Sequence, residues 1–207
     1  MITFLLRILA FIPAVVFHEV SHGVVANHYG DDTAKRAGRL TLNPISHIDP
    51  FGTILLPVVL ALTHFPPIGY AKPVPVNVSR LRKPRNQSVL VSLAGPATNI
   101  ILSFIGWVTL SILIHQQADL NSNFVTFVFY FGIVNLFMAV FNMIPIPPFD
   151  GSALLERLVP RSHLARYFEF RARALPFALI AMIIVLNTSL GQSFFGRIES
   201  WWISTLP

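Results

Sequence analysis

Residues 2–27, ITFLLRILAFIPAVVFHEVSHGVVAN, form an apolar segment that ends before the polar Tyr29-Gly30-Asp31-Asp32. A helix rises about 1.5 Å per residue, so this segment is long enough to cross the roughly 30 Å hydrocarbon core of a bilayer. Near its end it carries His18-Glu19-Val20-Ser21-His22. An ionisable side chain inside a spanning helix costs roughly 2.5–3.5 kcal/mol on insertion scales. These side chains therefore indicate a functional site.

The five residues match the pattern H-E-x-x-H. Histidines four positions apart lie one turn apart on one helical face, as two imidazoles on a single metal ion require. Glu19 is offset around the helix, within reach of a water on that metal. Zinc lowers the pKa of such a water towards about 7, and a nearby carboxylate can take its proton. The alternative is a polar helix face satisfied by neighbouring helices.

A catalytic zinc site usually has three protein ligands and one open position. The chain has no cysteine, so the third ligand is a His, Asp or Glu. Asp150 is the candidate: it follows Pro145-Ile146-Pro147-Pro148, which ends a helix, and precedes Gly151, which allows close approach of the backbone. The competing interpretation is that Asp150 caps the next helix.

The composition indicates a membrane protein. Of 207 residues, 54% are hydrophobic and 12% charged, against about 25% charged in soluble domains; the mean hydropathy is +0.64. The net charge of +6 does not predict a nucleic-acid partner, because thirteen of the fifteen Lys and Arg residues lie within 31–86 and 151–174, beside apolar segments. That distribution is typical of the positive-inside rule, with the lipid bilayer as partner.

We expect one membrane-embedded domain, residues 1–207. Its predicted parts are a helix over 1–27, a cytoplasmic or re-entrant region over 31–87, helices over 88–115 and 124–151, and amphipathic and transmembrane segments over 152–207. The fold class is an all-α polytopic membrane protein, a bundle of about four to six transmembrane helices. Within 31–87 we predict a short or re-entrant segment at 53–65 and a small β-hairpin or extended element involving 39–42 and 72–77.

The basic segments also predict an orientation. If residues 53–65 are re-entrant, both basic stretches face the cytoplasm. His18–His22, Gly95–Asn99 and Asp150 then lie at one depth, near the cytoplasmic side of the cell membrane.

Three ordered motifs carry a resemblance to a known family. Besides His18–His22, these are Gly95-Pro96-Ala97-Thr98-Asn99 and the N-x-x-P-x-x-x-x-D-G pattern of Asn142–Gly151. With them, the chain resembles the site-2 proteases, intramembrane zinc metalloproteases of the peptidase M50 type, in the short branch without a PDZ domain. The resemblance covers nearly the whole chain, including residues 43–50 and 71–77.

The resemblance implies a role for each matched residue. His18, His22 and Asp150 would bind one Zn²⁺, and Glu19 would be the general base. Asn142 would stabilise the oxyanion or hold substrate, unless it makes a hydrogen bond between helices. Gly95, Pro96 and Asn99 would form a substrate-binding element, with Asn99 contacting the substrate backbone or supporting the site.

The implied activity is hydrolysis of peptide bonds within or near transmembrane helices of membrane-protein substrates. A substrate helix must unwind first, and an extended segment such as 39–42 or 72–77 would hold it by β-augmentation. Two alternatives remain: an inactive membrane scaffold that binds transmembrane helices, and a metal transporter with an intramembrane histidine site. The sequence does not determine the oligomeric state.

Overall fold

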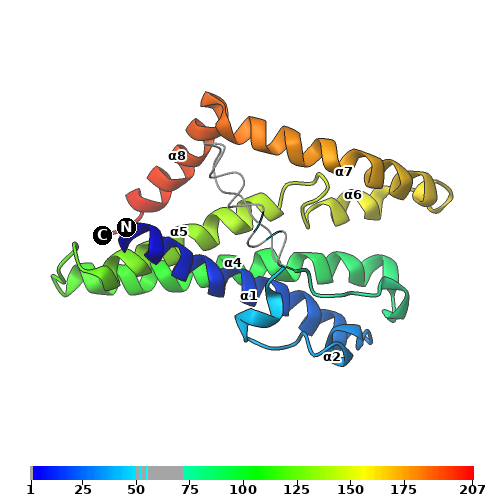
Figure 1. Cartoon of the computed structure of the whole chain (residues 1–207), viewed down its shortest axis with the longest axis horizontal. Helices are drawn as coiled ribbons and strands as arrows, with labels where there is room; N and C mark the ends of the chain where they lie inside the picture. Colours follow the sequence, from blue (N-terminus) through cyan, green and yellow to red (C-terminus); the bar gives the residue numbers. More distant parts are fainter. Residues whose placement is uncertain (1, 50–51, 53–54, 56–71) are drawn as a thin grey trace.

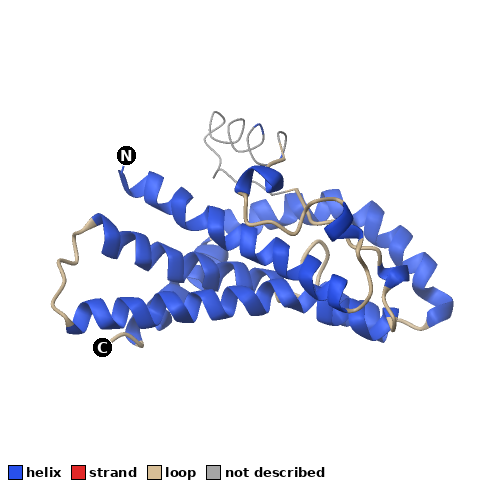
Figure 2. Ribbon diagram, turned by 90° about the horizontal axis from the view of Figure 1, so that it is seen from below, coloured by secondary structure: helices blue, strands red, loops and turns tan. Residues whose placement is uncertain are grey.

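The computed structural model describes residues 2–49, 52, 55 and 72–207, and the elements it contains are helical (Figures 1 and 2). In chain order these are α1 (Ile2–His28), α2 (Thr33–Arg36), η1 (Pro44–His47), η3 (Val78–Arg80), α4 (Pro84–His115), α5 (Asn123–Asn142), α6 (Ser152–Leu158), η4 (Arg161–His163), α7 (Leu164–Asn187) and α8 (Ser189–Ser204). The expected helices at 1–27 and 88–115 correspond to α1 and α4. The helix expected at 124–151 corresponds to α5 but ends earlier, at Asn142, because the prolines at 145, 147 and 148 do not continue a helix. The predicted C-terminal segments correspond to α6, α7 and α8.

Helices α1, α4 and α5 pack against one another and form a bundle along the length of the molecule, with α7 on the other side of α5 (Figure 1). Within the described part of the chain, these three are long and apolar enough to cross a membrane. The all-helical membrane fold predicted from the sequence is thus confirmed in outline. The total of about four to six spans stays a prediction.

Small and polar residues line the inner faces of these helices, and large apolar residues lie outside. Every fourth residue of α1 is buried, in the series Ala10, Ala14, His18, His22 and Ala26. A matching series in α4 is Gln87, Val91, Gly95, Asn99 and Ser103. Phe4, Phe11, Ile101 and Phe104 are among the large apolar residues that face outwards. Small inner residues let membrane helices approach closely. The same four-residue spacing places His18 and His22 on the inner face of α1, whereas its large apolar side chains lie on the outer face.

Helices α1 and α4 are antiparallel. His22 is hydrogen-bonded to the carbonyl of Val91, and Asn99 to the carbonyl of Ala14. The later residue of α1 thus pairs with the earlier residue of α4, as it does when two helices run in opposite directions. Residues 31–83 therefore begin and end at the same end of the bundle, which agrees with the predicted topology. The predicted re-entrant segment at 53–65 lies outside the described residues except for position 55.

The predicted β-hairpin is not present: residues 2–49 and 72–207 contain no strand. The physical reason lies in the hydrogen bonds of residues 72–77. The N–H groups of Val74 and Asn77 donate to the carboxylates of Glu19 and Asp31, not to a neighbouring strand. The segment is extended, but Glu19 of α1 and Asp31, which follows that helix, hold it in place.

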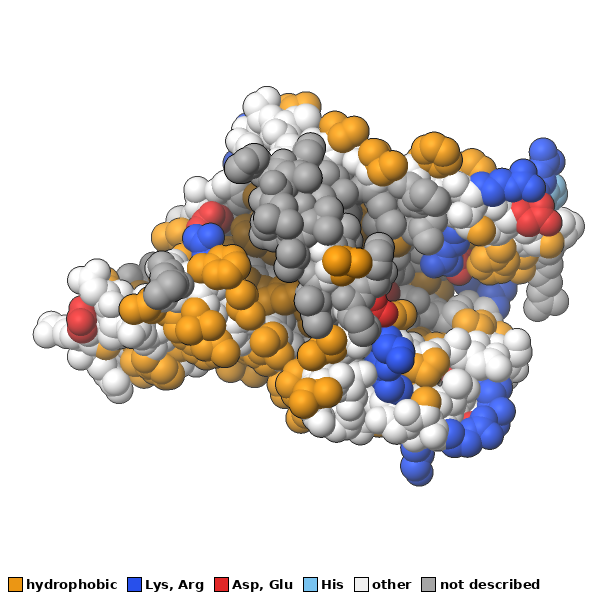
Figure 3. Space-filling model, viewed as in Figure 1, with side chains coloured by type: hydrophobic (Ala, Val, Ile, Leu, Met, Phe, Trp, Pro, Cys, Tyr) orange, Lys and Arg blue, Asp and Glu red, His pale blue; other side chains and the backbone are white. Residues whose placement is uncertain are grey.

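Basic side chains gather at one end of the molecule, where α1 ends and both α4 and α7 begin (Figure 3). They include Lys35, Arg36, Arg80, Arg82, Lys83, Arg85 and Arg166. The apolar surface of the helices lies between this end and the other. This is the charge distribution that the sequence predicted for one side of a membrane.

Candidate metal centre and active site

His18, His22 and Asp150 meet at one point, although Asp150 is more than 120 positions from the histidines. Asp150 Oδ2 lies 3.0 Å from His18 Nε2 and 3.3 Å from His22 Nε2. The two imidazole rings have centroids 4.7 Å apart and are nearly perpendicular. The three predicted metal ligands are thus brought together, with one ligand atom from each within 4.8 Å of the others.

The other ring nitrogen of each histidine is engaged by α4. His18 Nδ1 lies 2.5 Å from Asn99 Oδ1, and His22 Nδ1 lies 2.7 Å from the Val91 carbonyl. A carbonyl oxygen can only accept, so His22 carries its proton on Nδ1 and keeps the lone pair on Nε2 free. Such a partner on the far nitrogen is typical of a metal-bound histidine, whose tautomer and ring orientation it fixes.

Asp150 reaches the histidines from the loop that follows α5. Gly151 donates to the Asn142 carbonyl at 2.6 Å, and a Cβ atom at Gly151 would lie 2.4 Å from the Met143 carbonyl oxygen. Only glycine fits this close approach of the backbone. Helix α6 begins after Gly151 without a side-chain cap, so the Asp150 carboxylate is directed at the histidines and is not the cap that the alternative interpretation required.

Gly95 provides the space for both imidazole rings. A Cβ atom at this position would lie 2.5 Å from His22 Nε2 and 2.6 Å from His18 Nε2. The G-P-x-x-N element therefore bears directly on the histidines. Gly95, Pro96 and Asn99 are all buried, and none of them lines the cleft described below. Gly95 and Asn99 contact the histidines and so support the site, which is one of the two roles considered for Asn99.

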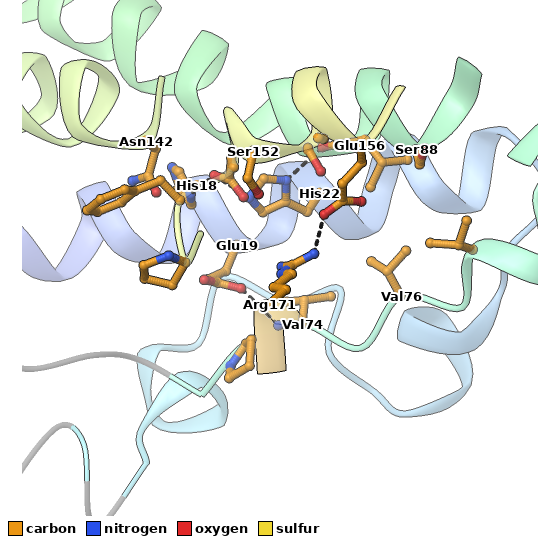
Figure 4. A pocket seen from close by; sticks show the side chains of 18 residues that line it. His18, Glu19, His22, Val74, Val76, Ser88, Asn142, Ser152, Glu156 and Arg171 are labelled. Carbon is orange, nitrogen blue, oxygen red and sulfur yellow. Dashed lines mark hydrogen bonds and ion pairs between the residues drawn. The ribbon is translucent and has the colours of Figure 1, made fainter. Parts of the chain in front are cut away.

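A cleft of about 780 Å³ lies beside the histidines and Asp150 (Figure 4). Glu19 lines it, and Glu19 Oε2 accepts a hydrogen bond of 2.8 Å from the backbone N–H of Val74. The sequence predicted the place of Glu19 beside the metal ligands but not this partner. The extended residues Pro73, Val74 and Val76 form part of the cleft wall.

Asn142 also lines the cleft, from the last turn of α5 (Figure 4). Its Nδ2 donates to the Met138 carbonyl at 3.0 Å, within the same helix. A side-chain amide has a second N–H and an oxygen, and the position of Asn142 allows these to meet a molecule in the cleft. This hydrogen bond lies within α5, whereas the alternative interpretation required one between two helices.

The far wall of the cleft carries an ion pair between Glu156 of α6 and Arg171 of α7 (Figure 4). Burial raises the pKa of Glu156, and the guanidinium of Arg171 opposes that effect. The sequence reasoning missed this pair, because no local pattern relates two charges fifteen positions apart in different helices. It also missed Asn135, although a polar residue in the middle of an apolar helix is a sign of a functional position.

The donor set fits a zinc ion. Tetrahedral zinc with bonds of about 2.0–2.1 Å to nitrogen and oxygen holds its ligand atoms about 3.3 Å apart, close to the two Nε2–Oδ2 distances. Asp150 Oδ2 is buried and makes no hydrogen bond of proper geometry, although two nitrogens lie near it. A cation between the three atoms would satisfy this orphaned oxygen.

The fold and the site together define a membrane metalloprotease. The chain belongs to peptidase family M50, the family of the site-2 proteases, whose sequence profile matches residues 6–115 and 108–186. It is a zinc metalloprotease of that family, as the sequence predicted.

Three relatives carry names that assign them as zinc metalloproteases. YwhC of Bacillus subtilis is 39% identical over 189 residues, which are 89% of this chain and 81% of YwhC. Rip2 of Mycobacterium tuberculosis is 30% identical, covering 98% of this chain and 74% of Rip2. Rip2 of Mycolicibacterium smegmatis is 27% identical, covering 96% and 73%. No solved structure matches the chain.

Proposed function

We propose that this protein is an intramembrane endopeptidase that cleaves peptide bonds within or near transmembrane helices of other membrane proteins. His18, His22 and Asp150 hold the zinc ion, Glu19 is the general base, and Asn142 assists at the reacting carbonyl. One observation carries the proposal. A complete ligand set and an acid face the same cleft, and three of these four residues belong to a helix suited to crossing a bilayer.

Zinc bound at this position would polarise the scissile carbonyl and lower the pKa of the attacking water. The chain supplies the remaining chemistry. Glu19 takes the proton of the attacking water and passes it to the leaving amine. Asn142 donates an N–H towards the developing oxyanion. The Val74 N–H holds one oxygen of the Glu19 carboxylate and so directs the other at the water.

The substrate must reach this cleft in an extended form, because a helix hides every amide in its own hydrogen bonds. Residues 72–77 are extended, and Pro73, Val74 and Val76 line the cleft. We place the unwound substrate along this segment. Residues 39–42, the other candidate from the sequence, do not line the cleft.

The site lies towards the basic end of the bundle. His18 and His22 are in the second half of α1, and Asp150 follows the end of α5. By the positive-inside rule this end faces the cytoplasm. Cleavage therefore takes place near the cytoplasmic side of the cell membrane.

The test uses the full chain in liposomes with a model substrate that has one transmembrane helix. Zinc content is measured by mass spectrometry, and the cut position is mapped on the products. Glu19→Gln should keep zinc and lose cleavage by at least about 10²-fold, the lower end of general-base contributions. The matched control, Glu169→Gln, changes an exposed glutamate of α7 and should cleave like the parent. Removal of zinc by a chelator should abolish cleavage, and added zinc should restore it.

Other outcomes would favour the alternatives. A scaffold would bind the substrate without cutting it even as the zinc-loaded parent protein. A transporter would move zinc into the liposomes at a rate that Glu19→Gln leaves unchanged. Cuts found only in soluble peptides, and never near the substrate helix, would disprove the intramembrane reaction while leaving the protein a metalloprotease.

A further inference from the structure

We infer that Asn135 is a positioning residue of the metal centre, which acts through Asn99 on His18. The inference deepens the proposed function, because it rests on His18 being a zinc ligand. Asn135 belongs to no motif that the sequence analysis used. It lies in the middle of α5, one of the three candidate spans.

A continuous series of hydrogen bonds leads from α5 to the metal centre. Asn135 Nδ2 donates to the Phe131 carbonyl at 2.8 Å. Asn135 Oδ1 accepts from Asn99 Nδ2 at 2.7 Å, and Asn99 Oδ1 lies 2.5 Å from His18 Nδ1. Asn99 and Asn135 are both 0% exposed, so no solvent competes for these groups.

The chemistry of each partner fixes the direction of the series. The Phe131 carbonyl can only accept, so Asn135 must turn its NH₂ group to it and its oxygen to Asn99. The Ala14 carbonyl, 3.2 Å from Asn99 Nδ2, also only accepts. Both N–H groups of Asn99 are therefore engaged, and its oxygen faces His18. His18 then carries a proton on Nδ1 and presents the lone pair of Nε2 to the metal.

A role in packing alone explains this arrangement less well. An average hydrogen bond between membrane helices contributes little to stability, and one asparagine is enough to make it. Here two buried asparagines are consecutive members of a series that ends on a metal-ligand nitrogen. If the Asn99 amide were turned over, its NH₂ group would face the Nδ1 proton of His18, and two donors would meet. In surroundings of low polarity this arrangement is costly. Asn135 is the group that, with the Ala14 carbonyl, prevents Asn99 from turning over.

The experiment measures the zinc affinity of the full chain in detergent by competition with a chelator, together with thermal stability of the zinc-free protein. Asn135→Leu should lower the zinc affinity by about 10-fold, the lower end of the 10- to 100-fold loss that follows removal of a direct partner of a metal-bound histidine, because Asn135 acts through Asn99. Asn135→Asp, protonated in this buried position, keeps an acceptor for Asn99 and should recover most of the affinity. Val128→Ala is the matched control: it opens a cavity at another buried position of α5 and should lower stability without changing zinc affinity.

A double-mutant cycle tests the path of action. Asn99→Leu and Asn135→Leu combined should weaken zinc binding no more than Asn99→Leu alone, since both remove the same support of His18. The inference is overturned if Asn135→Leu lowers stability while zinc affinity stays at the parent value, or if the two losses add. In such a case the parent still binds zinc and cleaves, so the proposed function stands.

A measurement on the unaltered protein keeps the inference testable if the leucine variant does not fold. Nitrogen-15 NMR of the His18 ring in the zinc-loaded parent should show a protonated Nδ1 and a metal-bound Nε2. The opposite assignment would overturn the inference without any substitution.

Discussion

The backbone N–H of Val74 donates a hydrogen bond to Glu19 Oε2 at 2.8 Å, across 55 positions of the chain. It joins the extended segment 72–77 to the acid of the H-E-x-x-H motif. The donor is a main-chain N–H, which nearly every residue has. The contact therefore depends on the path of the backbone and not on the type of side chain at position 74. The proposed general base is thereby oriented by a residue far from its motif.

Val74→Pro should reduce kcat about tenfold or more, a part of the 10²–10⁴-fold that general-base catalysis usually contributes. Proline removes the N–H that holds the Glu19 carboxylate. Zinc content should not change, because Glu19 is not among the ligands. Val74→Ala is the control: it keeps the N–H, and any loss it causes reflects the buried valine side chain. Equal kcat values for the two variants would show that the hydrogen bond has no catalytic role.

Gly95→Ala should prevent zinc binding. The added Cβ would lie 2.5–2.6 Å from ring atoms of both histidines. Alanine favours a helix over glycine by about 1 kcal/mol, whereas overpacking costs about 1–3 kcal/mol, so the clash prevails. Metal analysis of the purified variant measures the loss. The control is Gly196→Ala in α8, where a Cβ would meet nothing within 4 Å, and it should bind zinc normally. A zinc-loaded, active Gly95→Ala protein would contradict the site geometry.

Asp150→Asn distinguishes a metal ligand from a helix cap. Asparagine caps helices as well as aspartate does, so a capping role predicts little change. An amide lacks the negative charge of the carboxylate ligand, so the ligand role predicts a loss of zinc affinity of at least about 10-fold. Chelator competition gives the affinity, and circular dichroism verifies the helical fold. Parent-like zinc binding would remove Asp150 from the ligand set.

The pH dependence of stability should depend on Asp31, which is 0% exposed beyond the end of α1. Burial favours a higher pKa for Asp31, but hydrogen bonds from Thr33 and the Asn77 N–H, with Arg80 nearby, outweigh it and lower the pKa. The ionised group therefore contributes stability that is complete above its unfolded pKa of about 3.9 and is lost as the pH falls towards the lower folded value.

Thermal unfolding in detergent between about pH 6 and pH 3, which brackets that unfolded pKa, measures this contribution. Asp31→Asn should be less stable than the parent at pH 6, and the difference should narrow towards pH 3. The control, Asp119→Asn, changes an exposed loop residue and should follow the parent curve. A constant difference over the whole range would show that the charge of Asp31 does not stabilise the fold.

The sequence by itself predicted the three central helices and put His18 and His22 on one helical face, and the resemblance to a known family pointed to Asp150 as their partner. The reason is that lipid imposes a simple rule: long apolar segments become helices, and the few polar groups in them must face inwards. The ordered motifs at 18–22, 95–99 and 142–151 then indicated which polar groups meet.

The tertiary structure decided how those groups are held. The structure places Val74 at Glu19, Val91 at His22 and the Asn135–Asn99 pair at His18, through hydrogen bonds between residues 36 to 81 positions apart. Two of them use main-chain atoms, which every residue has and no motif marks. The same contacts explain why residues 72–77, extended as expected, do not form a hairpin: their N–H groups are directed to the carboxylates of Glu19 and Asp31. Such contacts depend on how the helices are placed relative to one another, and a local pattern in the chain carries no information about that placement.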